Sequence, residues 1–394
     1  AGEGGAAWTG GGAGGAGAGS GSPWRIAITW PMVAGRAAGS RCSPAVSRSV
    51  RGAGRSPGMG RTGPGGEEAQ VIAPSSSLGA WLQLGVAQVA APAPESALEL
   101  SSYQQFALRV SDLERSAQFY TELFGQEPVE RGGELVFALG SGPQHFVLTQ
   151  ARAGETPGFA WIGLSVERFD ADALSAAFAA RGFTRHSDGA SAALASRRYW
   201  QRGTPNAPRF FFTDAEGIVF RLMAADDCSG CATGEFGDGV LDARGINHFT
   251  NFVANFPRSN QLMRQVFGLG ILAYQGPSSP TLSIGDGYQF LMYVGGQDES
   301  APTQAGRTDH VSLSVEGFDV DAIRARLTQF GLTPAEGRRP PEPLTQWVSL
   351  RQPNRGGAQG GTPELYFSDP DGIAIQVQHP SYCGGGGYLG DECE

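Results

Sequence analysis

Hydrophobic and polar residues follow a pattern that repeats four times from residue 103 onward, with a period of roughly 60 residues. Each unit opens with a stretch in which apolar and polar residues alternate, as in a strand with one buried face. These strands are expected at 105–110, 161–166, 248–253 and 310–315. A fixed period of this kind indicates that one supersecondary unit is repeated.

A helix is expected after each of these strands. Asp112, Asp170 and Asp319 precede three of the apolar-periodic stretches as N-cap residues, because their side chains accept hydrogen bonds from free backbone N–H groups. Glycines able to adopt the left-handed conformation stand where the four helices should end, at Gly125, Gly182, Gly268 and Gly331. Further strands are expected after the helices, for example at 134–139, 210–213, 288–294 and 364–367. Each unit is therefore predicted to be a βαβββ module.

The first 95 of the 394 residues lack this periodicity and are rich in Gly, Ala, Ser and Arg. Such a segment cannot bury enough apolar surface to offset the entropy lost on ordering, so we expect a disordered leader at 1–95. Its arginine-rich start is typical of a transit peptide or of a non-native extension, and residues 77–94 weakly resemble a secretory cleavage region. These features favour an exported, periplasmic or organellar location without deciding it.

Charge and composition exclude several classes of function. The net charge of -9 argues against a nucleic-acid partner, because no basic face would be left to neutralise phosphates. All basic residues except histidine are arginine, which excludes Schiff-base chemistry on a lysine amine. The sequence contains no run of about 18 apolar residues that could span a membrane. A small-molecule substrate fits this composition best, and homo-oligomers remain possible.

Four of the five cysteines form two small clusters, each just after the last strand of a predicted domain. Cys228 and Cys231 form a CxxC, while Cys383 and Cys393 enclose a glycine-rich tail at 383–394. We expect a disulfide within each cluster, which requires an oxidising compartment. A four-cysteine zinc site is the alternative, since spacing alone does not choose between them.

Two motifs resemble those of a known family. The stretch from Val110 to Tyr120, followed by Leu123-Phe124-Gly125, resembles the opening of a glyoxalase or bleomycin-resistance module. Ser368-Asp369-Pro370-Asp371-Gly372 resembles the turn before the final strand of such a module, and residues 213–217 repeat it. The resemblance to the vicinal-oxygen-chelate superfamily covers about 103–380. It implies an α+β fold with four βαβββ modules paired into two domains, at 101–235 and 240–382.

In that superfamily two modules curl into a cup of strands that holds a divalent metal. The resemblance places the ligands at His248, His310 and Gln376, which are 62 and 66 residues apart. The alternation of side chains along a strand puts His310 and Ser312 on one face, and puts Gln376 on the polar face of its own strand. Two imidazoles and an oxygen donor suit Fe(II), with Mn(II) or Zn(II) as alternatives. Gln376 departs from the usual glutamate, so histidines bound to serine and water without metal are the competing interpretation.

The first predicted domain serves as an internal control. Its equivalent positions are Gln105, Trp161 and Arg221, which cannot bind a metal together because tryptophan offers no lone pair and arginine is a permanent cation. That cup is expected to be structural. Extradiol dioxygenases with two domains show the same division: the first domain lacks metal ligands, and the second domain holds the metal.

Tyr366 lies ten residues before Gln376, as the tyrosine of the extradiol signature lies before its third ligand. The histidine of that signature, expected near 357–359, is absent. The predicted function is a metal-dependent, extradiol-dioxygenase-like enzyme for a small aromatic or vicinally oxygenated substrate, with Tyr366 as proton donor. A non-catalytic binder of the bleomycin-resistance type, a glyoxalase-type lyase and a partner-binding protein are the alternatives. His145 and His186 are expected to be surface or loop residues, and His379 is expected to have a packing or solvent-exposed role.

Overall fold

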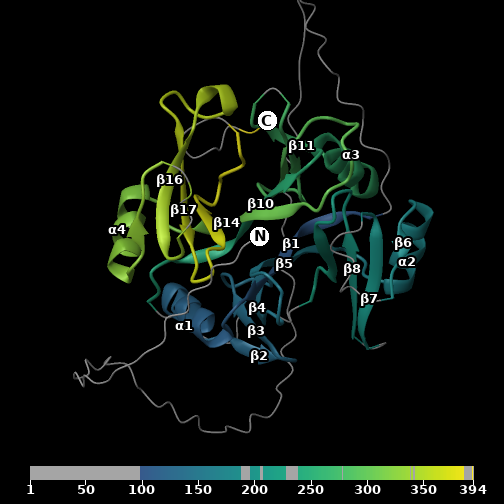
Figure 1. Cartoon of the computed structure of the whole chain (residues 1–394), viewed down its shortest axis with the longest axis horizontal. Helices are drawn as coiled ribbons and strands as arrows, with labels where there is room; N and C mark the ends of the chain where they lie inside the picture. The colour runs from purple at the N-terminus through teal and green to yellow at the C-terminus, as the bar shows by residue number, and fades with distance from the viewer. Residues whose placement is uncertain are drawn as a thin grey trace, which may run out of the picture. The chain divides into compact units, whose positions relative to one another are not determined.

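Two nine-stranded mixed sheets carry the fold, each formed by one stretch of the chain (Figure 1). The computed structural model describes residues 98–187, 196–204, 207–227, 238–276, 278–337, 339, 342–385 and 393. The first sheet has the order β2 (Val129–Arg131), β3 (Glu134–Ala138), β4 (His145–Gln150), β1 (Leu100–Val110), β5 (Gly158–Val166), β9 (Val219–Ala224), β8 (Ala207–Thr213), β7 (Arg198–Thr204) and β6 (Thr184–Arg185). The second has the order β11 (Ile271–Tyr274), β12 (Pro280–Ser283), β13 (Phe290–Gly295), β10 (Ala243–Val253), β14 (Arg307–Val315), β18 (Ala374–Gln378), β17 (Thr362–Ser368), β16 (Thr345–Arg351) and β15 (Thr333–Pro334).

Four α-helices lie in the described part of the chain, one in each module. They are α1 (Leu113–Phe124), α2 (Ala171–Ala180), α3 (Phe256–Phe267) and α4 (Val320–Phe330). The predicted aspartate caps accept hydrogen bonds from the first helical turn, and Asn255 caps α3 in the same way. Gly125, Gly268 and Gly331 end their helices in the left-handed conformation, whereas Arg181 caps α2 one residue before Gly182. None of these helices combines the length and apolar character needed to cross a membrane.

The order of elements confirms the predicted fold of four modules in two sheets. Modules one and three contain a strand, a helix and three strands, as expected. Modules two and four contain one further strand of two residues, β6 and β15, which the sequence pattern did not predict. The opening strands of each pair of modules lie antiparallel at the centre of their sheet, β1 beside β5 and β10 beside β14. Each sheet is thus two modules joined along their first strands.

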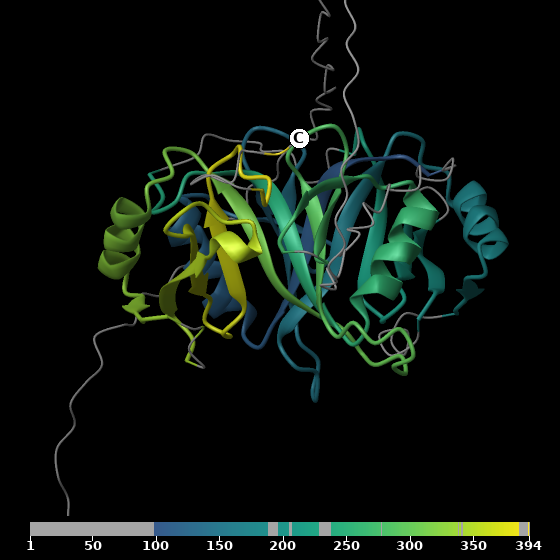
Figure 2. The ribbon, with the colours of Figure 1, turned by 90° about the horizontal axis from the view of Figure 1, so that it is seen from above.

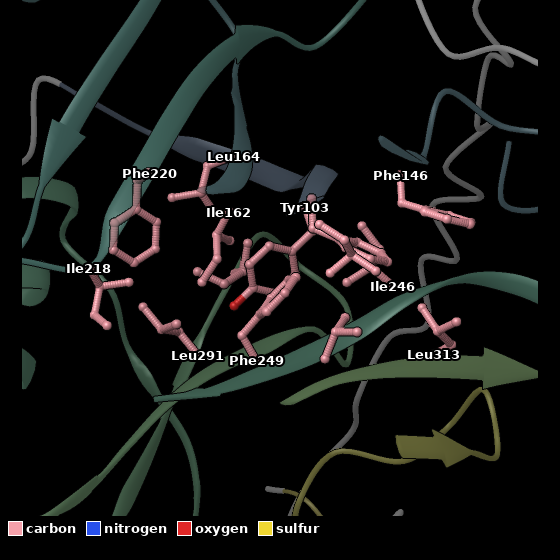
Figure 3. Close-up of a cluster of buried hydrophobic side chains, with 14 of the residues drawn as sticks. Tyr103, Phe146, Ile162, Leu164, Ile218, Phe220, Ile246, Phe249, Leu291 and Leu313 are labelled. Atoms are coloured by element: carbon pink, nitrogen blue, oxygen red, sulfur yellow. The ribbon is translucent and has the colours of Figure 1, made fainter. Parts of the chain in front are cut away.

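The two sheets share one hydrophobic core. A single cluster of buried side chains contains residues of both sheets and all four helices. Figure 3 shows part of this cluster around Tyr103, whose ring lies 5.0 Å from that of Phe249 in the second sheet. The hydroxyl of Tyr103 donates to the carbonyl of Phe290 at 2.9 Å. Because these contacts exclude water from both halves together, the two sheets stabilise each other.

Each helix of the first sheet lies near a helix of the second, with one such pair at each end of the sheets (Figure 2). Phe119 of α1 contacts Phe330 of α4, with ring centroids 5.5 Å apart. Phe178 of α2 contacts Phe267 of α3 at 6.3 Å. Module one therefore packs against module four, and module two against module three, although the sheets pair the modules differently. This second pairing closes the core.

Two glutamines join the first strands of the two sheets. Gln144 donates to the carbonyl of Tyr103 at 2.9 Å and accepts from the N–H of Ile246 at 2.7 Å. Gln289 makes the reciprocal pair, accepting from the Tyr103 N–H at 2.8 Å and donating to the Ile246 carbonyl at 2.6 Å. Both glutamines precede the strand that pairs in parallel with an opening strand, so the repeat in sequence produces a repeat in contacts.

One of the two predicted cysteine clusters lies among the described residues. Cys383 is fully buried and is linked to Cys393 with a Cα–Cα distance of 6.3 Å. The predicted pair Cys228 and Cys231 lies outside the described residues, as does the predicted leader at 1–95. Leu98, the first described residue, is 7% exposed and belongs to the hydrophobic core.

Candidate metal site in the second sheet

Strand register places the predicted ligands on one face of the second sheet. Pairing across the strands aligns a row of residues in the order Phe290, His248, Ser312, Gln376, Tyr366 and Trp347. Paired residues point their side chains to the same side of a sheet. His310 stands two residues before Ser312 on β14, hence on the same face. We call His248, His310, Ser312, Gln376 and Tyr366 the second-sheet site.

Both histidines are buried and held by neighbours. The His248 ring stacks on Phe290 at 4.2 Å and lies 5.5 Å from the His310 ring. Nδ1 of His248 lies 2.8 Å from Oδ1 of Asn247, whose orientation is fixed because its amide nitrogen donates to the Tyr382 carbonyl. Nδ1 of His310 lies 2.9 Å from a carboxylate oxygen of Asp309. In a neutral ring these contacts leave the lone pair on Nε2, the usual arrangement for ligating histidines.

Electrostatics favour the neutral form of His248. Burial lowers its pKa well below the usual value, and the nearby His310 and Arg351 lower it further. Burial alone would raise the pKa of Asp309, but the hydrogen bond and charge of His310, together with Arg307 and Arg339, hold it well below its usual range. Asp309 is thus an anion that supports His310. The neutral imidazole of His248, whose Nδ1 is bonded to Asn247, can bind a metal through its other nitrogen, whereas a protonated ring cannot.

Gln376 has unsatisfied hydrogen-bonding groups. It is 1% exposed, and neither its amide oxygen nor its amide nitrogen makes a hydrogen bond of good geometry in the described structure, although the side chain lies near His248 and Tyr382. The hydroxyl of its paired neighbour Ser312 is also buried without a partner there. Buried polar groups without partners are rare and costly. An oxygen donor beside two free imidazole nitrogens fits a divalent cation.

Gln376 is the candidate third donor beside the two histidines among the described residues. They contain no cluster of three His, Cys, Asp or Glu side chains that could hold an ion. Two histidines with a neutral amide oxygen therefore make the only donor set that the structure brings together at the predicted positions. Such a site binds a dication less tightly than one with a carboxylate, because it contributes no negative charge.

The first sheet shows what a satisfied version of this site looks like. Gln105 accepts hydrogen bonds from Trp161 at 2.7 Å and from Arg221 at 2.8 Å through the same oxygen, while its nitrogen lies 2.6 Å from His145 Nε2. The three positions predicted to be equivalent to the metal ligands thus bind one another. Arg221 is 8% exposed, and burial lowers its pKa to about 10. This first-sheet site is a hydrogen-bonded network built around a cation.

The expectation for His145 is wrong. This residue is 1% exposed and lies opposite Gln105 in the parallel ladder of β1 and β4. Burial lowers its pKa to about 4, so it is a neutral member of the first-sheet site. The position of His145 in the strand that pairs with the opening strand was the signal that could have predicted its burial beside Gln105. His186 and His379 are partly exposed, and His379 bonds to Ser381, which agrees with loop and packing roles.

Three further residues of the second-sheet face were not predicted. Tyr382 is fully buried, and its ring lies 5.6 Å from that of His248. Glu364 and Arg351 lie beside it, on β17 and β16. Glu364 could have been found, because it stands two residues before Tyr366 and shares its face. Tyr382 could not, since it belongs to a segment after the last strand that folds back over the sheet.

Known proteins agree with this architecture. Residues 102–222 match the model of the Glyoxalase/Bleomycin resistance protein/Dioxygenase superfamily. The first-sheet domain is therefore a member of this superfamily, and the second sheet repeats its topology. A trivalent organoarsenical cleaving enzyme of Thermomonospora curvata is 29% identical over 141 residues, which cover 34% of this chain and 90% of that enzyme.

Solved structures with the same fold cover both sheets. The Mn(II)-bound glyoxalase from Novosphingobium aromaticivorans aligns with a TM-score of 0.50 at 17% identity, over 71% of this chain and 82% of that one. Homoprotocatechuate 2,3-dioxygenase from Arthrobacter globiformis aligns with a TM-score of 0.50 at 15% identity, over 73% and 82% of the two chains. At this identity the likeness concerns the fold, and the reaction must be argued from the site.

Proposed function

We propose that this protein is a metal-dependent enzyme, extradiol-dioxygenase-like, that acts on a small aromatic or vicinally oxygenated substrate. His248, His310 and Gln376 hold the ion, for which Fe(II) is the first choice and Mn(II) or Zn(II) the alternatives. The observation that carries the proposal is the buried amide of Gln376, which makes no hydrogen bond of good geometry among the described residues and lies near two imidazoles that are held by Asn247 and Asp309.

Each residue of the second-sheet site has a distinct task in this proposal. The neutral ring of His248 and the Asp309-supported ring of His310 present Nε2 toward the ion. His248, His310 and Gln376, on three strands, would hold the ion, which would supply Lewis-acid activation and a template for a substrate with two vicinal oxygens. Tyr366 contacts the His310 ring at 5.2 Å and serves as proton donor to the substrate. Burial and the charge of Glu364 raise its pKa, which keeps its hydroxyl protonated.

A non-catalytic small-molecule binder is the second candidate, and one feature favours it. Gln376 supplies no charge, and a neutral donor weakens the metal affinity that catalysis requires while the buried, partly polar face of the sheet is kept. A glyoxalase-type lyase fits less well, because it would need a fourth, acidic ligand from the end of the third module. The strand there, β13, contains no carboxylate.

Metal content and oxygen uptake distinguish enzyme from binder. Protein purified under anaerobic conditions should contain about one equivalent of a divalent metal per chain and should consume oxygen with a catechol-type substrate. His310→Ala should abolish metal binding with the fold retained, because the side chain lies in the site and not in the shared core. Trp161→Ala, at the equivalent position of the first sheet, is the matched control and should leave metal content unaltered. Metal without oxygen uptake or turnover would favour the binder.

A further inference from the structure

The first sheet aligns a second row of side chains at the places of the second-sheet site. Pairing across its strands gives the order His145, Gln105, Gly163, Arg221, Phe211 and Trp200. Trp161 stands two residues before Gly163 on β5, so it shares this side of the sheet. We call Trp161, Arg221, Phe211 and Trp200 the aromatic face. Arg221 has the place in this row that Gln376 has in the other.

This side of the first sheet is the inside of a curve. Arg209 on β8 stands two residues before Phe211, and Glu134 on β3 stands two residues before Val136, which pairs through β4 and β1 with Trp161. β3 and β8 are separated by four strands, which would set them about 24 Å apart in a flat sheet. Nη1 of Arg209 nevertheless lies 3.2 Å from a carboxylate oxygen of Glu134. The sheet therefore curls around the aromatic face, so that side chains of distant strands meet across it.

Arg221 is a buried cation that forms no ion pair within the described part of the chain. It is 8% exposed, one of its five N–H groups donates from Nη1 to Gln105, and its Nε is buried without an acceptor there. Burial and the charge of Arg209 lower its pKa to about 10, against the opposing charges of Asp227 and Glu134, so the guanidinium stays charged at neutral pH. Buried charges persist in proteins when they are paired. An anion bound on the aromatic face would supply the missing partner.

Aromatic rings line the face beside the guanidinium. The Trp161 ring meets the Phe211 ring edge to face at 5.7 Å, and the Trp200 ring stacks on Phe211 at 5.5 Å. Trp200 is 2% exposed, and its Nε1 is a second buried donor without an acceptor among the described residues. Trp161 is partly exposed, and the exposed Arg202 holds its guanidinium 5.8 Å from the Phe211 ring. The face thus combines an apolar wall with hydrogen-bond donors that lack acceptors.

We propose that the aromatic face of the first sheet binds a small aromatic carboxylate, independently of the metal chemistry proposed for the second sheet. A carboxylate matches the planar guanidinium of Arg221 and accepts from its free N–H groups, whereas a neutral ligand leaves the charge uncompensated. The ring of the ligand packs against the partly exposed Trp161. Arg202, exposed at the edge of the face, attracts the anion from solvent. The positions equivalent to the metal ligands thus form a site for an anion in place of a cation.

The test measures binding of benzoate to the full chain by isothermal titration calorimetry, with a chelator present so that no metal can take up the carboxylate. Benzamide has the same ring without the charge, and acetate has the charge without the ring. The wild type should bind benzoate about tenfold or more tightly than either. Arg221→Met keeps an unbranched side chain and removes the charge, so it should lower the affinity for benzoate to that for benzamide.

Arg185→Met is the matched control, because Arg185 is exposed on β6 and pairs with Tyr199, on the opposite side of the sheet from Trp200. It removes the same charge and should leave the affinity for benzoate unchanged. A wild type that binds benzoate no better than benzamide or acetate would overturn the proposal, as would equal affinities of Arg221→Met and the wild type or equal losses in both variants. A melting curve checks the fold of Arg221→Met. If that variant is unfolded, the preference of the wild type among the three probes still decides whether the site requires both a charge and a ring.

Discussion

At the scale of single residues, the two sheets differ most in how their central glutamines are satisfied. Gln105 in the first sheet bonds to Trp161, Arg221 and His145, whereas Gln376 in the second has no partner of good geometry among the described residues. The same residue type therefore completes a hydrogen-bonded network around the Arg221 cation in one sheet and leaves its amide without a partner of good geometry in the other. Which role a glutamine has depends on its neighbours across the strands.

Gln376→Glu should tighten binding of a divalent ion by about tenfold or more, because it adds a negative charge to a buried site with neutral imidazoles. Isothermal titration with Mn(II) measures the change. Gln105→Glu is the matched control, since the same substitution in the first sheet meets Arg221 and should create no metal site. If the wild type binds no metal under any condition and the Glu variant binds it readily, the site has lost its metal. That outcome would favour the non-catalytic small-molecule binder.

At the scale of elements, the turn before the last strand of each sheet contains a buried aspartate. Asp214 and Asp369 each accept two backbone N–H bonds of their own turn through Oδ1, at 2.8–2.9 Å. Burial raises the pKa of each to about 6, against an ordinary value of 3.8. The folded protein therefore keeps protons at these positions that the unfolded chain has already released.

This difference predicts that stability falls as pH rises from about 4 to about 6, since the unfolded state binds fewer protons across that window. Each aspartate should contribute on the order of 2–3 kcal/mol to the change. Urea unfolding of the wild type and of Asp214→Asn with Asp369→Asn at both ends of the window measures it. The double variant should lose less stability across the window than the wild type. Parallel pH profiles of the two proteins would contradict the assignment.

The C-terminal segment is the element that the disulfide constrains. We expect Cys383 and Cys393 to be oxidised, and Cys393→Ser to lower the free energy of unfolding by about 2–3 kcal/mol by freeing a ten-residue loop. Because Tyr382 is buried next to Cys383, the variant should also loosen the contact of Tyr382 with Glu364. Intact mass after thiol labelling without reductant counts the free cysteines. Labelling of both Cys383 and Cys393 in the folded protein would count against this pairing.

At the scale of the whole molecule, the first described strand already contributes to the shared core. Leu98 and Leu100 are 7% and 8% exposed and belong to the shared core. A chain that starts at residue 96 should melt like the full chain, whereas one that starts at residue 101 should be less stable by about 1.5–3 kcal/mol for each lost leucine. Thermal melts of the three proteins test this. Equal melting of all three would show that these leucines contribute nothing.

Local pattern was enough to predict the modules and the alignment of the ligands. The alternation of side chains along a strand determines which of them share a face. His248, His310 and Gln376 are about one module apart in the sequence, which agrees with one candidate ligand from each repeat. The register then follows, because neighbouring opening strands pair along their length. The helix caps were equally predictable, since an aspartate at the N-terminus of a helix bonds to backbone groups only three residues away.

Contacts between distant segments were decided by the tertiary structure alone. The burial of His145 depends on β4 adding to β1, and the meeting of Glu364, Arg351 and Tyr382 depends on the C-terminal segment folding over the second sheet. The packing of module one on module four follows from closing the core. Sequence by itself determined the four modules and their strand faces, because those depend on neighbours a few residues away, whereas the candidate ligand positions came from the resemblance to a known family. The partners of each buried polar group were settled only when strands from both ends of the chain came together.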